Sequence, residues 1–278
     1  MGSFLKIVAL AAAAVLSACA GAPKQAPDAT TSAASTKAPP YTLERFRDEH
    51  KLPDGTQRIV LDNPYGDIQL RQTSGAAVAI EGVEQRIGEQ PRIARIEWHE
   101  EGAEAAVRVR YPGIDPDAPA DRRRGRVDLY AFVPAGVPVS LRSDFGEIVV
   151  RRIDNPVQAR SRSGRITVAT HGLIEAESVD GELRIYPMSA RATGTHRLRT
   201  AGGIVVDVHL QDPLQVEARA PRAVRADFPL DVLRQDEDGQ WRASFQRGDP
   251  ASPALRRFDI ESSGGEVVLQ SIGDGANR

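Results

Sequence analysis

Histidine, serine and acidic side chains are the groups in this 278-residue chain whose spacing could support catalysis or metal binding. No two histidines show a metal-binding spacing such as HExxH, and we expect all five to lie on the surface. These are His50, His99, His171, His196 and His209. Gly-x-Ser-x-Gly is absent, and so is the Gly-Gly-x-Gly-x-Asp signature of calcium-binding repeats. We therefore expect a protein that is not an enzyme and that has no cofactor and no metal.

Arginines form the cluster with the clearest binding potential. Arg151, Arg152, Arg160 and Arg162 could form a basic patch for an anionic polysaccharide, lipid A or phospholipid headgroups. Acidic residues nearby in sequence favour instead a solvated face of mixed charge. Lys and Arg total 36 against 38 Asp and Glu, a net charge of −2. Because nucleic-acid binding needs a basic excess, no nucleic acid is expected as a partner.

The first forty residues predict export and a membrane anchor. A ten-residue apolar run is too short to span a bilayer as a helix but suits a signal peptide over residues 1–18. The Leu-Ser-Ala-Cys sequence ending at Cys19 resembles the bacterial lipobox, which implies that this cysteine carries acyl chains such as palmitate. Ala20, in place of aspartate, favours the outer membrane. Residues 19–40 are rich in Ala, Pro, Ser and Thr and predict a disordered tether.

A glycine followed by apolar residues two and four positions later recurs six times. The repeat glycines are Gly66, Gly146, Gly164, Gly181, Gly202 and Gly265. A small polar residue stands three places ahead of five of them, at Asn63, Ser143, Ser161, Ser178 and Ser262. Adjacent copies lie 18, 17 and 21 residues apart. A unit of that length, with period-two apolar alternation around it, predicts stacked β-structure.

Within one repeat, two short strands meet at a glycine corner. Glycine suits a corner that needs a positive φ or that has no room for a Cβ, and a serine hydroxyl can satisfy backbone groups left unpaired there. One repeat buries too little apolar surface to stand alone, so Ile148, Ile166 and Leu183 should stack on strands about 4.8 Å apart. The residues after the glycines should then form an outward ladder of alternating charge, Glu147, Arg165 and Glu182.

The order of these units resembles the bacterial DUF4097 family, also called the putative adhesin family. The resemblance is carried by the Asn-x-x-Gly-x-Ile unit at 63–68, the Val-Pro-x-Gly-Val step at 133–137, the repeats at 143–148, 161–166 and 178–183, and the closing unit at 262–267. It covers about residues 55–270 and implies a β-solenoid-like fold without established catalytic residues. The copy at Gly202 departs from the pattern, because Thr200 lies two places ahead of the glycine. We expect its corner to be shifted by one residue.

The sequence therefore predicts an all-β fold, a β-solenoid or β-helix-like stack with 17–21 residues per repeat. Residues 41–130 would form N-terminal β layers or a cap and residues 131–278 the repeats, with 41–278 as one continuous domain. The expected protein is non-catalytic and lipid-anchored in the bacterial cell envelope, and presents a binding or structural surface. Its partners would be the membrane, through the lipid anchor, and an envelope protein or glycan.

Two alternatives remain open at this point. One is a carbohydrate-active enzyme that cleaves an acidic polysaccharide, which would need Arg151, Arg152 and Arg162 on one face together with acidic partners. The other is a signalling partner that reports on the state of the envelope.

Overall fold

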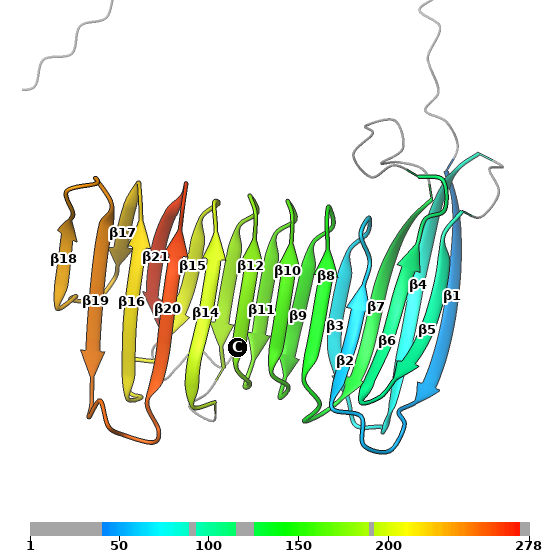
Figure 1. Ribbon diagram of the computed structural model, residues 1–278, viewed down its shortest axis with the longest axis horizontal. Helices are drawn as coiled ribbons and strands as arrows, with labels where there is room; N and C mark the ends of the chain where they lie inside the picture. Colours follow the sequence, from blue (N-terminus) through cyan, green and yellow to red (C-terminus); the bar gives the residue numbers. More distant parts are fainter. Residues whose placement is uncertain (1–40, 89–92, 115–124, 189–191, 273–278) are drawn as a thin grey trace, which may run out of the picture. The chain divides into compact units, whose positions relative to one another are not determined.

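The computed structural model describes residues 41–88, 93–114, 125–188 and 192–272. Every regular element in these ranges is a β-strand (Figure 1). Residues Pro39–Arg278 form one compact unit. The predicted signal peptide, the tether and Cys19 lie outside the described residues. Within the described ranges, no helix has the length and apolar character needed to cross a membrane.

The strands form two mixed sheets of parallel central strands, with antiparallel strands at one end of the first sheet and at both ends of the second. Sheet A has the spatial order β1 (Tyr41–Lys51), β4 (Ala77–Ile87), β7 (Arg126–Pro134), β3 (Ile68–Thr73), β9 (Ile148–Ile153), β11 (Ile166–Thr170), β13 (Leu183–Pro187), β15 (Ile204–Val208), β21 (Glu266–Ser271) and β17 (Ala223–Ala226). Sheet B has the order β18 (Val232–Gln235), β19 (Trp241–Arg247), β16 (Leu214–Ala220), β20 (Arg256–Ser262), β14 (Gly194–Thr200), β12 (Ile174–Ser178), β10 (Val157–Ser161), β8 (Val139–Ser143), β2 (Arg58–Asp62), β6 (Glu104–Arg110) and β5 (Arg95–Glu101).

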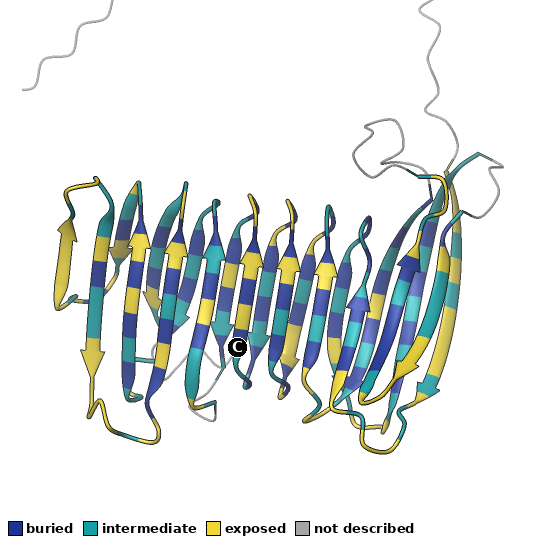
Figure 2. Ribbon diagram, viewed as in Figure 1, coloured by how far each residue is buried: buried dark blue, intermediate teal, exposed yellow. Residues whose placement is uncertain are grey.

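The core lies between the two sheets, and it follows from the period-two alternation of the sequence. Buried and accessible residues alternate along the central strands, as the banding in Figure 2 shows. Ile166 pairs in parallel register with Ile148 on one side and Leu183 on the other, and all three are fully buried. The predicted stack of these side chains is confirmed, and the architecture is an all-β stack of parallel strands.

The repeat glycines form one column along a corner of this stack. None of them has a positive φ. Instead, a Cβ on any of them would collide with a carbonyl oxygen of the adjacent layer. The Cβ–oxygen distance would be 1.6 Å for Gly66, 2.0 Å for Gly146, 1.8 Å for Gly164, 2.2 Å for Gly181, 2.5 Å for Gly202 and 2.3 Å for Gly265. Of the two reasons that the sequence offered for these glycines, lack of room is therefore the one that applies.

The small polar residues ahead of the glycines bond the corner. The Gly146 amide donates to Ser143 Oγ (2.8 Å), and this hydroxyl donates to the Gly66 carbonyl of the neighbouring layer (3.1 Å). Thr200 makes the same two contacts, with the Gly202 amide (2.9 Å) and the Gly181 carbonyl (2.6 Å). The link between β14 and β15 is one residue shorter than the link between β10 and β11, so Thr200 reaches these groups from two positions before its glycine. The expected shift by one residue is confirmed.

The spatial order of the layers differs from their order in the chain. Strands β2 and β3 pair directly with β8 and β9, while β4 to β7 fold outward beyond them. At the other end, β20 and β21 lie between the β14–β15 layer and the β16–β17 layer (Figure 1). Thus Gly66 lies beside Gly146, and Gly202 beside Gly265, although each pair is distant in sequence.

One histidine departs from the surface position expected for all five. His196, on β14, is fully buried, stacks on Phe258 of β20 with 4.4 Å between the ring centroids, and accepts a hydrogen bond from the Ile174 amide at Nδ1 (3.2 Å). It lies on the inward side of its strand, where the packed layers of the core enclose it. The expectation of an exposed His196 is wrong.

Candidate functional site

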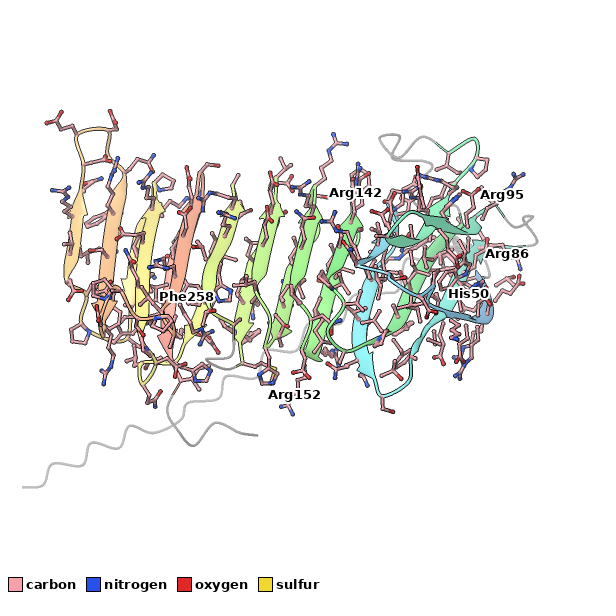
Figure 3. The ribbon with its side chains drawn as sticks, turned by 60° about the horizontal axis from the view of Figure 1, so that its bottom comes forward. His50, Arg86, Arg95, Arg142, Arg152 and Phe258 are labelled. Atoms are coloured by element: carbon pink, nitrogen blue, oxygen red, sulfur yellow. The ribbon has the colours of Figure 1, made fainter. Side chains whose placement is uncertain are left out.

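The structure does not gather the four predicted arginines on one surface. Arg151 and Arg152 lie on β9, on the outer face of sheet A. Arg160 lies on the outer face of sheet B, with its Nε 3.5 Å from Glu177 Oε2. Arg162 lies at the corner between the sheets, its guanidinium 5.5 Å from the centroid of the Phe145 ring. Figure 3 shows Arg152 on the opposite side of the stack from Arg142, a residue of sheet B. The predicted patch is thus divided between two faces and a corner.

The two arginines of β9 form a β-bulge. β11 pairs with β9 on both sides of this point, so that Ala169 of β11 lies opposite two residues, Arg151 and Arg152. Arg152 has a φ of 50°, the one positive value at a non-glycine residue in the described ranges. Such a conformation is unfavourable for a residue with a Cβ, and bulges often turn side chains toward a site.

The sequence of β9 explains why the bulge forms. Strict alternation after Val150 would place Arg152 in the core and Ile153 in solvent. Burial of an unpaired guanidinium would cost several kcal/mol. The additional residue shifts the alternation by one, so that both arginines are exposed and Ile153 is fully buried. The local strain is therefore offset by placing three side chains in suitable surroundings.

The bulge borders a shallow hollow on sheet A with a volume of about 650 Å³. Arg71 of β3, the cross-strand partner of Arg151, extends the cationic side. Tyr186 of β13 borders the hollow two strands away, and Ala169, its cross-strand partner, leaves open space between them. We call this surface, defined by Arg71, Arg151, Arg152, Ala169 and Tyr186, the arginine hollow.

The charge at the arginine hollow is poorly balanced. Within the described residues, no acidic side chain lies within ion-pair distance of Arg71 or Arg151. The nearest acidic residue along the chain, Asp154, is bonded to Gln72 through two contacts, backbone amide to Oε1 (2.7 Å) and Nε2 to Oδ2 (3.3 Å). Clustered guanidinium groups with bidentate donors are well suited to bind phosphate or carboxylate.

Other arginines form ion pairs across neighbouring layers. The predicted ladder is confirmed, because Arg165 contacts Glu147 (3.7 Å) and Glu182 (3.1 Å) in the layers on either side. On sheet B, Arg199 pairs with Glu261 (3.2 Å).

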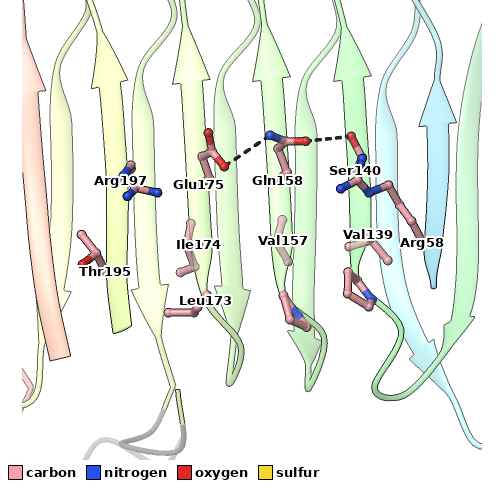
Figure 4. A pocket seen from close by; sticks show the side chains of 12 residues that line it. Arg58, Val139, Ser140, Val157, Gln158, Leu173, Ile174, Glu175, Thr195 and Arg197 are labelled. Atoms are coloured by element: carbon pink, nitrogen blue, oxygen red, sulfur yellow. Dashed lines mark hydrogen bonds between the residues drawn. The ribbon is translucent and has the colours of Figure 1, made fainter. Parts of the chain in front are cut away.

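A second, smaller hollow lies on sheet B, and its polar groups bond to one another (Figure 4). Ser140 Oγ donates to Gln158 Oε1 (3.4 Å), and Gln158 Nε2 donates to Glu175 Oε2 (3.3 Å). Arg58 and Arg197 line the same hollow. Because its central side chains already bond across the strands, this hollow is a weaker candidate than the arginine hollow.

Sequence reasoning identified two of the three arginines of the hollow and missed Arg71 and Tyr186. Their proximity depends on strand pairing between segments that are far apart in the chain. One signal for the bulge was present, because the apolar residues Val150 and Ile153 are three positions apart where the strand pattern requires two.

Comparisons with known proteins give structural similarity alone. Neither a protein-family model nor a curated protein matches the sequence, so the DUF4097 resemblance stays a prediction. Crystal structures of a "putative cell adhesion protein" from Clostridium sporogenes and a "putative adhesin" from Bacteroides fragilis align with TM-scores of 0.48 and 0.42. Each is 10% identical and aligns over 82% of this chain, and over 100% and 97% of its own chain, respectively. A "putative lipid binding protein" from Parabacteroides distasonis aligns with a TM-score of 0.27 and 7% identity, over 82% of this chain and 97% of that one.

Proposed function

We propose that this chain is a lipid-anchored protein of the bacterial cell envelope whose β-solenoid binds an anionic envelope component without catalysing a reaction. The observation that carries the proposal is the arginine hollow, where Arg71, Arg151 and Arg152 share one outer face. Among the described residues, Arg71 and Arg151 have no carboxylate within ion-pair distance. A site of this kind attracts an anion over the Debye length and holds it by charge-assisted hydrogen bonds.

The stack of parallel strands supports a binding role because it holds the arginines in fixed register. Arg71 and Arg151 are cross-strand neighbours, and the layers beneath them are joined by fully buried side chains and by the hydroxyl bonds of the corner. Because the sheet already fixes the backbone, only the side chains must be ordered on binding, which favours affinity.

The proposal is tested with the full chain, purified in a zwitterionic detergent and immobilised. We expect it to retain radiolabelled anionic envelope extract at low salt and to release it at 0.5 M salt. Arg71→Gln/Arg151→Gln should lose retention. Arg160→Gln, which removes an arginine from sheet B, should keep it. Equal retention by all three proteins would contradict the binding site, and turnover of a defined envelope glycan would contradict the non-catalytic role.

The lipid anchor has its own test. Cells that express the chain are grown with an alkyne-labelled palmitate, and the protein is detected by its label and by membrane fractionation. We expect the wild type to carry the label and to sediment with the outer membrane, and Cys19→Ala to carry none. Equal label in both proteins would contradict acylation of Cys19.

A further inference from the structure

Resting on the proposed anion binding, we infer that the ligand of the arginine hollow is a pyranose sugar that carries a phosphate monoester. The phosphate would lie against Arg71 and Arg151, and the sugar ring would lie over Ala169 against Tyr186. A free sugar phosphate and a phosphorylated glycan share this chemistry.

The charge of the hollow selects a phosphate monoester over a carboxylate. Arg71 and Arg151 lie side by side on two neighbouring strands, β3 and β9, and neither has an ion-pair partner among the described residues. A phosphate monoester carries a charge of about −1.5 to −2 at pH 7 and three acceptor oxygens, whereas a carboxylate carries one charge and two oxygens. The monoester therefore matches more of the donors that the hollow presents.

The spacing of the strands leaves room for a ring beside the phosphate. Tyr186 lies two strands from Arg151, about 10 Å at the usual distance between strands. Between them β11 presents Ala169 and Thr167, which are small and partly accessible. A tyrosine offers a flat apolar face with a polar hydroxyl edge, and this suits a sugar ring with its apolar CH face and its hydroxyl groups.

The test is calorimetric titration of the detergent-solubilised full chain with glucosamine 1-phosphate, inorganic phosphate, glucuronate and glucosamine. We expect glucosamine 1-phosphate to bind most tightly and glucosamine, which lacks the phosphate, not to bind. Arg151→Gln should weaken glucosamine 1-phosphate at least about tenfold, the loss of one charge-assisted contact, and the control Arg160→Gln should change it less than about twofold. Tyr186→Ala should weaken the sugar phosphate about fivefold and leave inorganic phosphate unchanged.

The outcomes separate this inference from the proposed function. If Tyr186→Ala weakens inorganic phosphate and glucosamine 1-phosphate equally, the sugar platform is wrong. If glucuronate binds as tightly as glucosamine 1-phosphate, the ligand class is wrong, while retention that depends on Arg71 and Arg151 would leave the proposed function intact. If Arg151→Gln affects neither titration nor retention, both are overturned.

Discussion

At the scale of single residues, the repeat glycines are explained by close approach between layers. Gly164→Ala would place a Cβ 1.8 Å from the Gly146 carbonyl oxygen, so that the layers must separate at a corner made of backbone. We expect this substitution to lower the free energy of unfolding by about 3 kcal/mol or more, the upper part of the range for overpacking. Urea denaturation followed by circular dichroism measures it.

Gly203→Ala is the matched control for this prediction. The nearest atom to its Cβ would be 3.8 Å away, and its φ is not positive, so we expect a change within about 0.5 kcal/mol. A comparable loss in Gly164→Ala and Gly203→Ala would show that corner glycines matter through chain flexibility and not through lack of space.

Because His196 is buried, we expect the free energy of unfolding to depend on pH. Burial, with a further effect of the Arg256 charge, lowers the pKa of His196 to about 3. An unfolded histidine titrates near 6.5, so between these values the unfolded chain binds a proton that the folded chain does not. Stability is therefore unaffected above about pH 6.5 and falls as the pH is lowered, by about 2 kcal/mol between pH 7 and pH 5.

The measurement is urea denaturation at pH 7 and pH 5 for the wild type, His196→Asn and His99→Asn. His196→Asn removes the titration and should lose about 2 kcal/mol less than the wild type between the two pH values. His99 is exposed, and its variant should follow the wild type. If the three proteins lose equal stability, His196 is not the group responsible.

At the scale of elements, strand β9 carries arginines of the proposed binding site together with local strain. Arg152 has a left-handed φ of 50°, which costs about 1 kcal/mol for a residue with a Cβ, whereas glycine adopts it freely. We expect Arg152→Gly to raise the free energy of unfolding by up to about 1 kcal/mol and to weaken anion binding. Denaturation and calorimetric titration on the same samples test both parts.

Arg151→Gly is the control, and we expect its change in the free energy of unfolding to have the opposite sign to that of Arg152→Gly. Arg151 has no positive φ, so Arg151→Gly adds flexibility to a strand and should destabilise the protein by about 1 kcal/mol while it also weakens binding. If Arg152→Gly and Arg151→Gly destabilise equally, the bulge stores no strain.

The corners were predictable from the sequence because each is a local event of five or six residues, with a hydroxyl or amide, a glycine and an apolar residue at fixed spacing. For the bulge the sequence holds one signal alone, the spacing of Val150 and Ile153, since its formation depends on the unfavourable burial of Arg152 competing with backbone strain. A second bonded corner was also missed. There Thr170 Oγ1 donates to the Asn155 carbonyl (2.7 Å) and accepts from the Gly172 amide (2.9 Å), in a Thr-x-Gly pattern that the sequence also shows at 73–75 and 200–202.

At the scale of the whole folded unit, the order of the layers could not be read from the sequence. The repeats predict that layers stack but not that the segment after β19 returns to lie between β14 and β16. Among the described strands, the β16–β17 layer and the β18–β19 hairpin connect to the preceding layers only through pairing with β20 and β21.

This arrangement predicts that the two ends of the stack respond differently to a defect in the inserted layer. Ile260 is buried on β20, and Ile260→Ala should cost about 2–4 kcal/mol locally. In a stack whose layers contact their neighbours, the loss should be greatest near the defect. Trp98 on β5 and Trp241 on β19 report on opposite ends.

Trp98→Phe and Trp241→Phe each leave one fluorescent reporter, so the two ends can be followed separately in urea. We expect Ile260→Ala to move the unfolding midpoint reported by Trp241 to lower urea and to leave the midpoint reported by Trp98 nearly unchanged. The same mutation should slow refolding at Trp241 alone, because β16 to β19 join the preceding layers through the weakened β20–β21 layer. Equal shifts at Trp98 and Trp241 would mean that the stack unfolds as one cooperative unit and that the inserted layer is not a boundary within it.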